Sequence, residues 1–298
     1  MDKSLFQKQS VIVKLILDLL ITFLVFTVIF FIGLAIGSKI YHIPVLSFIT
    51  NAATMDNIAA LKYLVFLQSV ALFLFPAYAI SWLFSRPTSF FGLNRVPSWR
   101  TAGMIILVVL ISQVVVNYLA FVNNALHFPP RLEQMFRTME NQNLALTRRL
   151  LLDASFSALA VNIFIIALIP ALGEELFFRG VIQRHLQEGL RNYHVAVITT
   201  AFIFAFVHFS FFTFLPRFFL GIILGYIYVW QKNIWASALA HFTNNFLGVV
   251  MYFVAVRRGM DLTQLEHPQK ASFLLFAAGF ILVILLMIKI KQWSDVES

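Results

Sequence analysis

Apolar runs long enough to cross a lipid bilayer constrain this chain more than any other feature of its sequence. A helix needs about 20 mainly apolar residues to span roughly 30 Å of hydrocarbon. The sequence has about eight such runs, near residues 11–36, 61–84, 102–122, 151–172, 194–212, 214–231, 234–256 and 271–290. Backbone groups in lipid must be hydrogen-bonded internally, so we predict helices. The expected fold is all-α: a polytopic transmembrane helical bundle with about eight spans.

The composition excludes a water-soluble globular protein. Hydrophobic residues make up 60% of the 298 positions and charged residues 12%, whereas soluble domains are about half apolar and a quarter charged. The net charge is +9, but the basic residues are spread through short loops. We therefore expect the lipid bilayer as a partner and no nucleic acid. The expected organisation is a single integral membrane domain, 1–298, multi-pass in the cell inner membrane.

One connection differs from the other loops. Residues 127–150 contain a Pro pair that can start a helix, and Leu132, Met135, Phe136 and Met139 then recur at helical spacing with charges between them. This pattern predicts an amphipathic helix. It lies either at the membrane interface or packed on the bundle as an ordinary loop helix.

Ionisable residues within or beside the apolar runs are the informative ones. A charge at the centre of a bilayer costs about 2.5–3.5 kcal/mol or more, so such residues usually face a partner or a cavity. Asp18 and Asp153 lie near the ends of runs, and we interpret them as interfacial. Three clusters remain: Glu174, Glu175 and Arg179; then His208; then His241 and Asn245.

Helix geometry separates the two adjacent glutamates. Glu175 and Arg179 are four residues apart, so they share a face and can pair. Glu174 is rotated from Glu175 by about 100° and has no helix partner. We therefore predict that Glu175 and Arg179 are a structural pair and that Glu174 is the functional group, a general base.

The two histidines complete a set suited to hydrolysis. His241 and Asn245 are four residues apart, and Phe204 precedes His208 by one turn. A carboxylate, two imidazoles and an amide could surround one water and one carbonyl. One difficulty is depth: His208 is about 14 residues into its run and His241 about 7 into its own, a mismatch of about 10 Å if the helices are parallel.

These motifs resemble the CAAX-protease and bacteriocin-processing (CPBP, Abi-type) intramembrane proteases, whose pattern is EExxxR, FxxxH, then HxxxN or HxxxD. The sequence matches all three within a core of residues 150–256. The resemblance implies a helical bundle with peptide-bond hydrolysis in a membrane-embedded cavity. It implies that Glu174 and His208 activate water, that His241 and Asn245 stabilise the oxyanion, and that Glu175 pairs with Arg179.

The cofactor is a separate question. Glu174, His208 and His241 could supply the three ligands typical of catalytic zinc, but Glu174 would then not be free to act as the base. HExxH is absent, and Asn245 suits an oxyanion better than a metal. The residue types therefore favour a glutamate-activated water without an obligatory metal, with zinc as the alternative.

Two other functions compete with a protease that acts on a membrane-associated peptide or protein. A non-enzymatic immunity or scaffold protein of the same fold could keep the polar cluster as a binding site. A proton-coupled transporter could use Glu and His as a relay. The transporter is less favoured, because the polar residues all lie in the second half of the chain and show no inverted symmetry.

Overall fold

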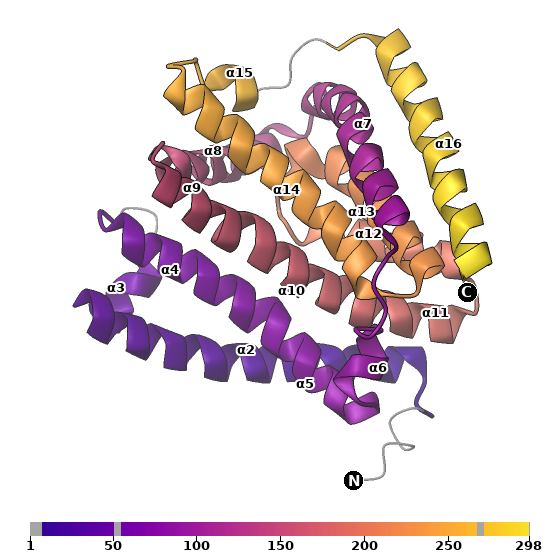
Figure 1. Ribbon diagram of the computed structural model, residues 1–298. Coiled ribbons are helices and arrows are strands. Elements are labelled where there is room, and N and C mark those ends of the chain that lie inside the picture. Colours follow the sequence, from indigo (N-terminus) through magenta and orange to yellow (C-terminus); the bar gives the residue numbers. More distant parts are fainter. Residues whose placement is uncertain (1–7, 51–54, 267–270, 298) are drawn as a thin grey trace.

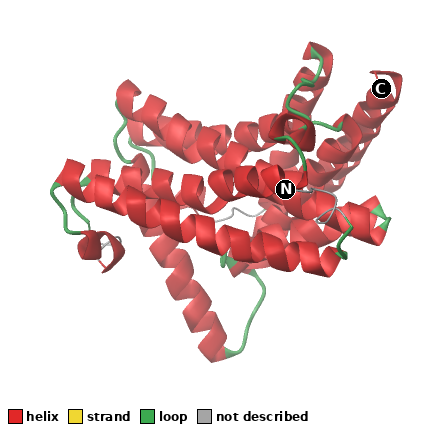
Figure 2. Ribbon diagram, turned by 90° about the horizontal axis from the view of Figure 1, so that it is seen from below, coloured by secondary structure: helices red, strands yellow, loops and turns green. Residues whose placement is uncertain are grey.

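The computed structural model describes residues 8–50, 55–266 and 271–297, and these residues form helices and loops without a strand (Figure 2). Seven helices in this part of the chain are long and apolar enough to cross a membrane. They are α2 (Val11–Tyr41), the α4-to-α5 run (Ile58–Phe84), α7 (Trp99–Asn124), the α9-to-α11 run (Phe156–Leu190), α13 (Phe214–Gln231) with its preceding turn η5 (Phe211–Thr213), α14 (Ile234–Arg257) and α16 (Phe273–Glu297). The predicted all-α polytopic bundle is correct.

One of the eight predicted spans, 194–212, is shorter than expected. Helix α12 covers Tyr193–Phe206, which is 14 residues or about 21 Å, less than the roughly 30 Å of hydrocarbon. The predicted run 194–212 is interrupted because the chain turns after Phe206, with Phe209 in a left-handed conformation at φ 49°. The other helices outside the spans of the described chain are the 22-residue α8 (Pro130–Leu151) and the short α3 (Val45–Thr50), α6 (Pro87–Phe91) and α15 (Thr263–Glu266).

Two of the spanning helices contain widened π-helical turns. The α4-to-α5 run consists of α4 (Ile58–Ser69), η2 (Val70–Leu74) and α5 (Phe75–Phe84), and the other run consists of α9 (Phe156–Asn162), η3 (Ile163–Leu168), α10 (Ile169–Phe177), η4 (Phe178–Gln183) and α11 (Arg184–Leu190). Pro76 and Pro170 each follow a π turn by two residues. A proline lacks an N–H and crowds the preceding turn, so a π turn before it lets the helix continue. As a result the helix passes the predicted end near residue 172, and the two glutamates lie inside it.

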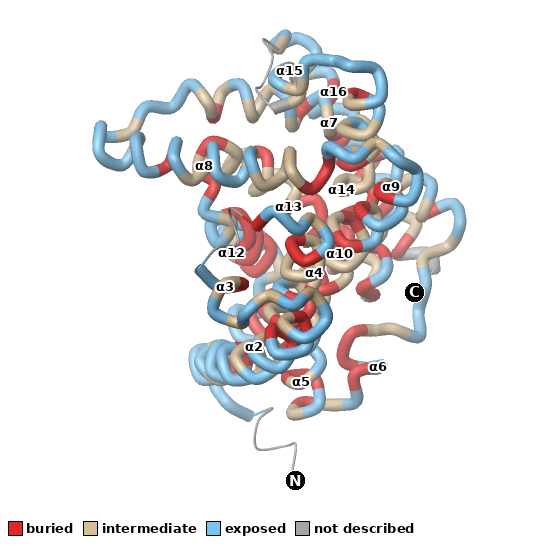
Figure 3. The backbone as a smooth tube through the Cα atoms, turned by 90° about the vertical axis from the view of Figure 1, so that its left-hand side faces the viewer, coloured by how far each residue is buried: buried red, intermediate tan, exposed pale blue. Residues whose placement is uncertain are grey.

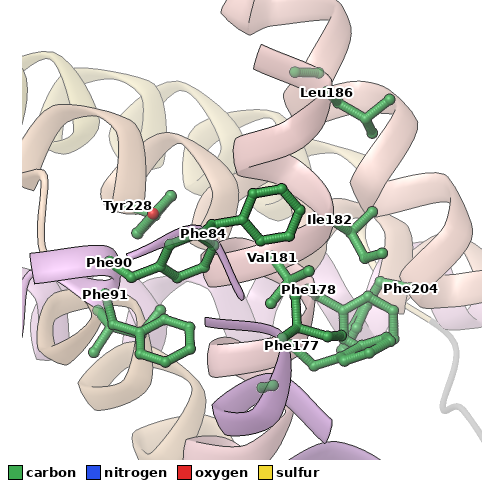
Figure 4. Close-up of a cluster of buried hydrophobic side chains, with 14 residues drawn as sticks. Phe84, Phe90, Phe91, Phe177, Phe178, Val181, Ile182, Leu186, Phe204 and Tyr228 are labelled. Carbon is green, nitrogen blue, oxygen red and sulfur yellow. The ribbon is translucent and has the colours of Figure 1, made fainter. Parts of the chain in front are cut away.

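The helices form layers around the α9-to-α11 run. Helix α2 and the α4-to-α5 run lie side by side on one side of it, and α14 crosses the middle of the bundle (Figure 1). Helices α7, α13 and α16 pack together beyond α14. A phenylalanine-rich cluster, with Phe84, Phe90, Phe177, Phe178 and Phe204, fills the centre of one end of the bundle (Figure 4).

The outermost helices expose apolar side chains. On α2, Leu19 and Phe23 are exposed, and on α16 Leu274 is 78% exposed. Figure 3 shows the same division, with exposed residues on the outer face of α2 and buried ones inside the bundle. In a chain with seven spanning helices, these apolar faces are the surface that contacts lipid.

Asp18, which we interpret as interfacial, has a partner inside the bundle, and its depth in the membrane stays a prediction. Its side chain is fully buried, and its Oδ2 lies 2.7 Å from Nδ1 of His185 in α11. Lys14, one turn earlier, forms an ion pair with Glu188 at 2.9 Å. These contacts join α2 to α11, so the charge is buried with a partner rather than solvated. Asp153 is exposed between α8 and α9.

The predicted amphipathic helix is α8. Phe136 is its buried anchor and stacks on Phe211 with ring centroids 4.0 Å apart. Leu132 and Met135 stay exposed, and Met139 is half-buried. The helix therefore packs on the bundle through part of its apolar face, and its position at a membrane interface stays a prediction.

The tight contact between α12 and α13 gives a first testable prediction. A Cβ added at Gly221 would lie 3.0 Å from Cβ and 3.1 Å from Cα of Ala201, closer than ordinary contact. Because Cα belongs to the backbone, Gly221→Ala must push the two helices apart, and we expect a loss of about 1–3 kcal/mol, measured as a lower thermal midpoint in detergent. Gly103→Ala is the control, since no atom lies within 4 Å of its added Cβ. Equal midpoints for the two variants would contradict the close packing.

Candidate active site

The second glutamate is the buried centre of the site. Glu175 and Arg179 are both fully buried, and Oε1 of Glu175 accepts a hydrogen bond from Nη1 of Arg179 at 2.8 Å. The same Oε1 lies 2.9 Å from Nδ1 of His241. Arg179 also donates from Nη2 to the carbonyl of Gly221 at 3.2 Å. The pairing expected from helix spacing is present, and its two residues also tie the α9-to-α11 run to α13 and α14.

The first glutamate faces the two histidines. Oε2 of Glu174 lies 3.9 Å from Nε2 of His208 and 3.8 Å from Nε2 of His241. Its side chain is 13% exposed and has no hydrogen bond within the described part of the chain. Both contacts are too long for a direct hydrogen bond, so Glu174 faces two ring nitrogens without the short ion pair that holds Glu175.

His208 is placed by the end of α12 and not by the middle of a helix. Its Nδ1 lies 2.6 Å from the carbonyl oxygen of Phe204. A carbonyl only accepts, so Nδ1 donates, and in the neutral ring Nε2 keeps its lone pair directed at Glu174. The ring of Phe204 packs edge-on against both His208 and His241, which gives the phenylalanine of this motif a positioning role.

The predicted depth mismatch between the histidines is wrong. Both imidazoles reach the same carboxylate oxygen of Glu174. Counting residues from helix starts assumes that α12 and α14 begin at one depth. It also assumes that His208 lies within a helix, whereas it lies in the turn after α12. The convergence of the rings shows that the helix starts are offset along the bundle.

A cavity of about 90 Å³ lies against both imidazoles. That volume holds a few water molecules. Glu174 is not among its lining residues and lies beside it, next to the two Nε2 atoms. The lining residues that carry polar groups are His208, Arg217, His241, Asn244 and Asn245.

A chain of amides orients Asn245. Gln113 on α7 donates from Nε2 to Oδ1 of Asn244 at 3.2 Å, and Asn244 donates from Nδ2 to Oδ1 of Asn245 at 3.3 Å. The oxygen of Asn245 is thereby used as an acceptor. Its NH₂ group is the part left to donate in the cavity.

The relay of amides from Gln113 to Asn245 gives a second prediction. Gln113→Leu removes the donor that fixes Asn244, so Asn245 can turn its oxygen towards the cavity. For the peptide hydrolysis that the resemblance of the motifs implies, we expect kcat to fall about tenfold, the equivalent of one hydrogen bond, with little change in thermal midpoint. Gln134→Leu, on the exposed face of α8, is the control. An unchanged kcat in Gln113→Leu would show that the relay does not orient Asn245.

The three motifs supply seven residues of the site, and three others, Gln113, Asn244 and Arg217, lie outside the motifs. Gln113 and Asn244 reach the site only through the packing of α7 on α14, which no local spacing reports. Arg217 did leave a signal, because it is an arginine near the start of the apolar run 214–231. An ionisable residue within a spanning segment is a functional candidate by default.

The donor types around Glu174 are those that zinc takes, so the expected site without an obligatory metal stays a prediction. Two imidazole nitrogens and a carboxylate are common zinc ligands, and both rings are held through Nδ1 as metal-bound histidines often are. Within the described residues, however, no three His, Asp or Glu side chains are arranged to hold a metal ion.

Comparison with protein families identifies this region of the chain. The family described as Rce1-like, type II CAAX prenyl endopeptidase Rce1-like, matches residues 156–247, which contain all three motifs. Neither the curated proteins nor the solved structures include a match to the chain. The family match supports the resemblance to CAAX proteases that the motifs carry.

Proposed function

We propose that this integral, multi-pass membrane protein of the CAAX-protease family is an intramembrane endopeptidase of the cell inner membrane, acting on a membrane-associated peptide or protein. The observation that carries the proposal is the position of Glu174, whose Oε2 lies 3.9 and 3.8 Å from the Nε2 atoms of His208 and His241. A carboxylate without a short ion pair, beside two oriented imidazoles and a cavity that holds a few waters, is suited to activating water.

The reaction begins at Glu174. Its carboxylate takes a proton from a water that also donates to Nε2 of His208, and the water oxygen bonds to the substrate carbonyl carbon. The carbonyl π electrons move to oxygen, and the NH₂ group of Asn245 stabilises this oxyanion. When Nε2 of His241 carries a proton it donates there too, with Glu175 holding the other ring nitrogen. Collapse re-forms the carbonyl and breaks the C–N bond, and the leaving amine takes the proton from Glu174.

Comparison of protein termini tests this function. We expect membranes with the wild-type protein to contain new N- and C-termini that are missing with Glu174→Ala, and these define the substrate and the cleaved bond. Glu133→Ala, on α8 away from the cavity, is the matched control and should give the wild-type pattern. Identical termini in all three samples would contradict the protease function.

Metal dependence is a third prediction. Because Glu174 acts as the base and Asn245 as a neutral oxyanion donor, no step requires a metal, and we expect activity to survive exhaustive chelation. Elemental analysis of the purified protein, with activity measured before and after chelation and after zinc is added back, decides the question. A stoichiometric metal whose removal abolishes activity and whose return restores it would make Glu174, His208 and His241 the ligands.

A further inference from the structure

Arg217 is a cation in the candidate catalytic cavity that no motif includes. It lies in the first turn of α13 and lines the cavity together with His208, His241 and Asn245. Its Nη1 donates to the hydroxyl of Thr213, and the carbonyl of Ser210 lies 3.5 Å away. One edge of the guanidinium is thus fixed, while the N–H groups on Nε and Nη2 have no hydrogen-bond partner in the described structure.

The environment of Arg217 differs from that of Arg179. Arg179 is fully buried and its charge is matched by Glu175 at 2.8 Å. Among the described residues Arg217 has no ion pair, although its charge interacts through space with the carboxylates of Glu174 and Glu140. A cation in an apolar segment is costly unless an anion is nearby. The arrangement therefore leaves a fixed positive charge facing the space where negative charge appears during hydrolysis.

The turn that holds Arg217 is itself fixed by α8. The hydroxyl of Ser210 donates to Oε2 of Glu140 and lies 2.8 Å from the hydroxyl of Thr213. Thr213 in turn accepts from Arg217. The same turn carries His208, so one network places both the guanidinium and an imidazole at the cavity. A preorganised donor of this kind needs little rearrangement as the reaction proceeds.

We propose that Arg217 is a catalytic residue that binds the oxyanion together with Asn245, a role that rests on the proposed peptide hydrolysis. In the first step the negative charge leaves Glu174 and appears on the carbonyl oxygen, so the net charge of the cavity does not change. Arg217 interacts with Glu174 before the step and contacts the oxyanion after it. Asn245 is neutral, and with Arg179 committed to Glu175, Arg217 supplies the compensating charge.

The test measures kcat and KM on a fluorogenic peptide spanning the bond that the comparison of termini identifies. For Arg217→Gln we expect kcat to fall about 10²–10³-fold, as for loss of an oxyanion donor. KM should stay within a few fold of the wild-type value, and the thermal midpoint within a few degrees. Arg217→Lys keeps the positive charge but lacks the paired N–H groups of the guanidinium, and its kcat should be about tenfold lower than that of the wild type. Guanidinium at a low, non-denaturing concentration should restore activity to Arg217→Ala. Arg137→Gln, an arginine that packs on Phe212 outside the cavity, is the control with wild-type kcat.

The outcomes separate this proposal from the proposed function. Wild-type kcat in Arg217→Gln beside an inactive Glu174→Gln would overturn the role of Arg217 and leave the protease function standing. A loss confined to KM, or one that guanidinium does not restore, would also overturn it. Full activity in Arg217→Gln, Glu174→Gln and Glu175→Gln alike would show that the hydrolysis does not come from this site and would overturn the protease function itself. If Arg217→Gln does not fold, the proposal is tested with Arg217→Lys. An unchanged kcat in Arg217→Lys would contradict a contact between the paired N–H groups of the guanidinium and the oxyanion.

Discussion

Glu174→Gln is expected to lower kcat for peptide hydrolysis by about 10²–10⁴-fold, the usual contribution of a general base. Glutamine has nearly the same shape but cannot take a proton from water at neutral pH. The two contacts of Glu174 with imidazole nitrogens are 3.9 and 3.8 Å long, and it has no short ion pair. Its replacement therefore removes the base and leaves the packing of α10 intact, so the thermal midpoint should stay close to that of the wild type.

The measurement is kcat on the substrate identified from protein termini, with insertion and thermal midpoint as controls for folding. Glu188→Gln is a matched carboxylate control, since Glu188 lies near the C-terminal end of the α9-to-α11 run, outside the cavity, and pairs with Lys14. Full activity in Glu174→Gln would move the base to Glu175. If Glu175→Gln were also fully active, the proposed protease function would be contradicted. A non-enzymatic immunity or scaffold protein would then explain the polar cluster better.

The spanning helices could be predicted because lipid imposes both a length and a composition on them. Two predicted span boundaries were wrong, at places where apolar length and composition do not report where a helix ends. The run 194–212 continues through Phe206, His208 and Phe211, so apolar composition hides the turn that ends α12. The run 151–172 was ended too early for the opposite reason: the helix continues past its charges because Glu175 and Arg179 neutralise each other inside the bundle.

The site could be predicted as far as local spacing reaches. Four-residue spacing on one helix indicated the contact of Glu175 with Arg179, and motif order indicated which histidines belong together. The amide relay is different, because Gln113 and Asn244 are 131 residues apart and meet only through helix packing. The contact of Asp18 with His185 could not be predicted for the same reason, since the two residues are 167 positions apart.

Phe204 shows why a motif residue need not take part in the chemistry. Its carbonyl fixes the tautomer of His208, and its ring lies under the guanidinium of Arg179 at 4.8 Å. The same ring packs against His241. One apolar side chain therefore aligns both imidazoles with the buried ion pair, which links the stability of the core to the geometry of the site.

Arg179→Ala should produce the largest loss of stability among these variants. Arg179 is fully buried, and removing it leaves Glu175 as a buried carboxylate without its ion pair and the carbonyl of Gly221 without its donor. Loss of one partner of a buried pair typically costs about 3–5 kcal/mol. We expect a large drop in thermal midpoint in detergent, far beyond that of Glu174→Gln, because Glu174 has no comparable partner. Arg137→Ala, which breaks an exposed four-residue pair with Glu133, should cost at most about 1 kcal/mol.

The double variant Arg179→Met with Glu175→Gln isolates the cause. If the loss in Arg179→Ala comes from an unpaired buried charge, removing both charges should recover part of the thermal midpoint, since uncharged side chains of similar size can replace a buried pair at little cost. Activity should not recover, because His241 would lose the carboxylate that holds its Nδ1 at 2.9 Å. Small and equal losses in Arg179→Ala and Glu174→Gln would contradict the structural role of the pair. A double variant less stable than Arg179→Ala would show that packing of the guanidinium on Phe204, and not charge, carries the stability.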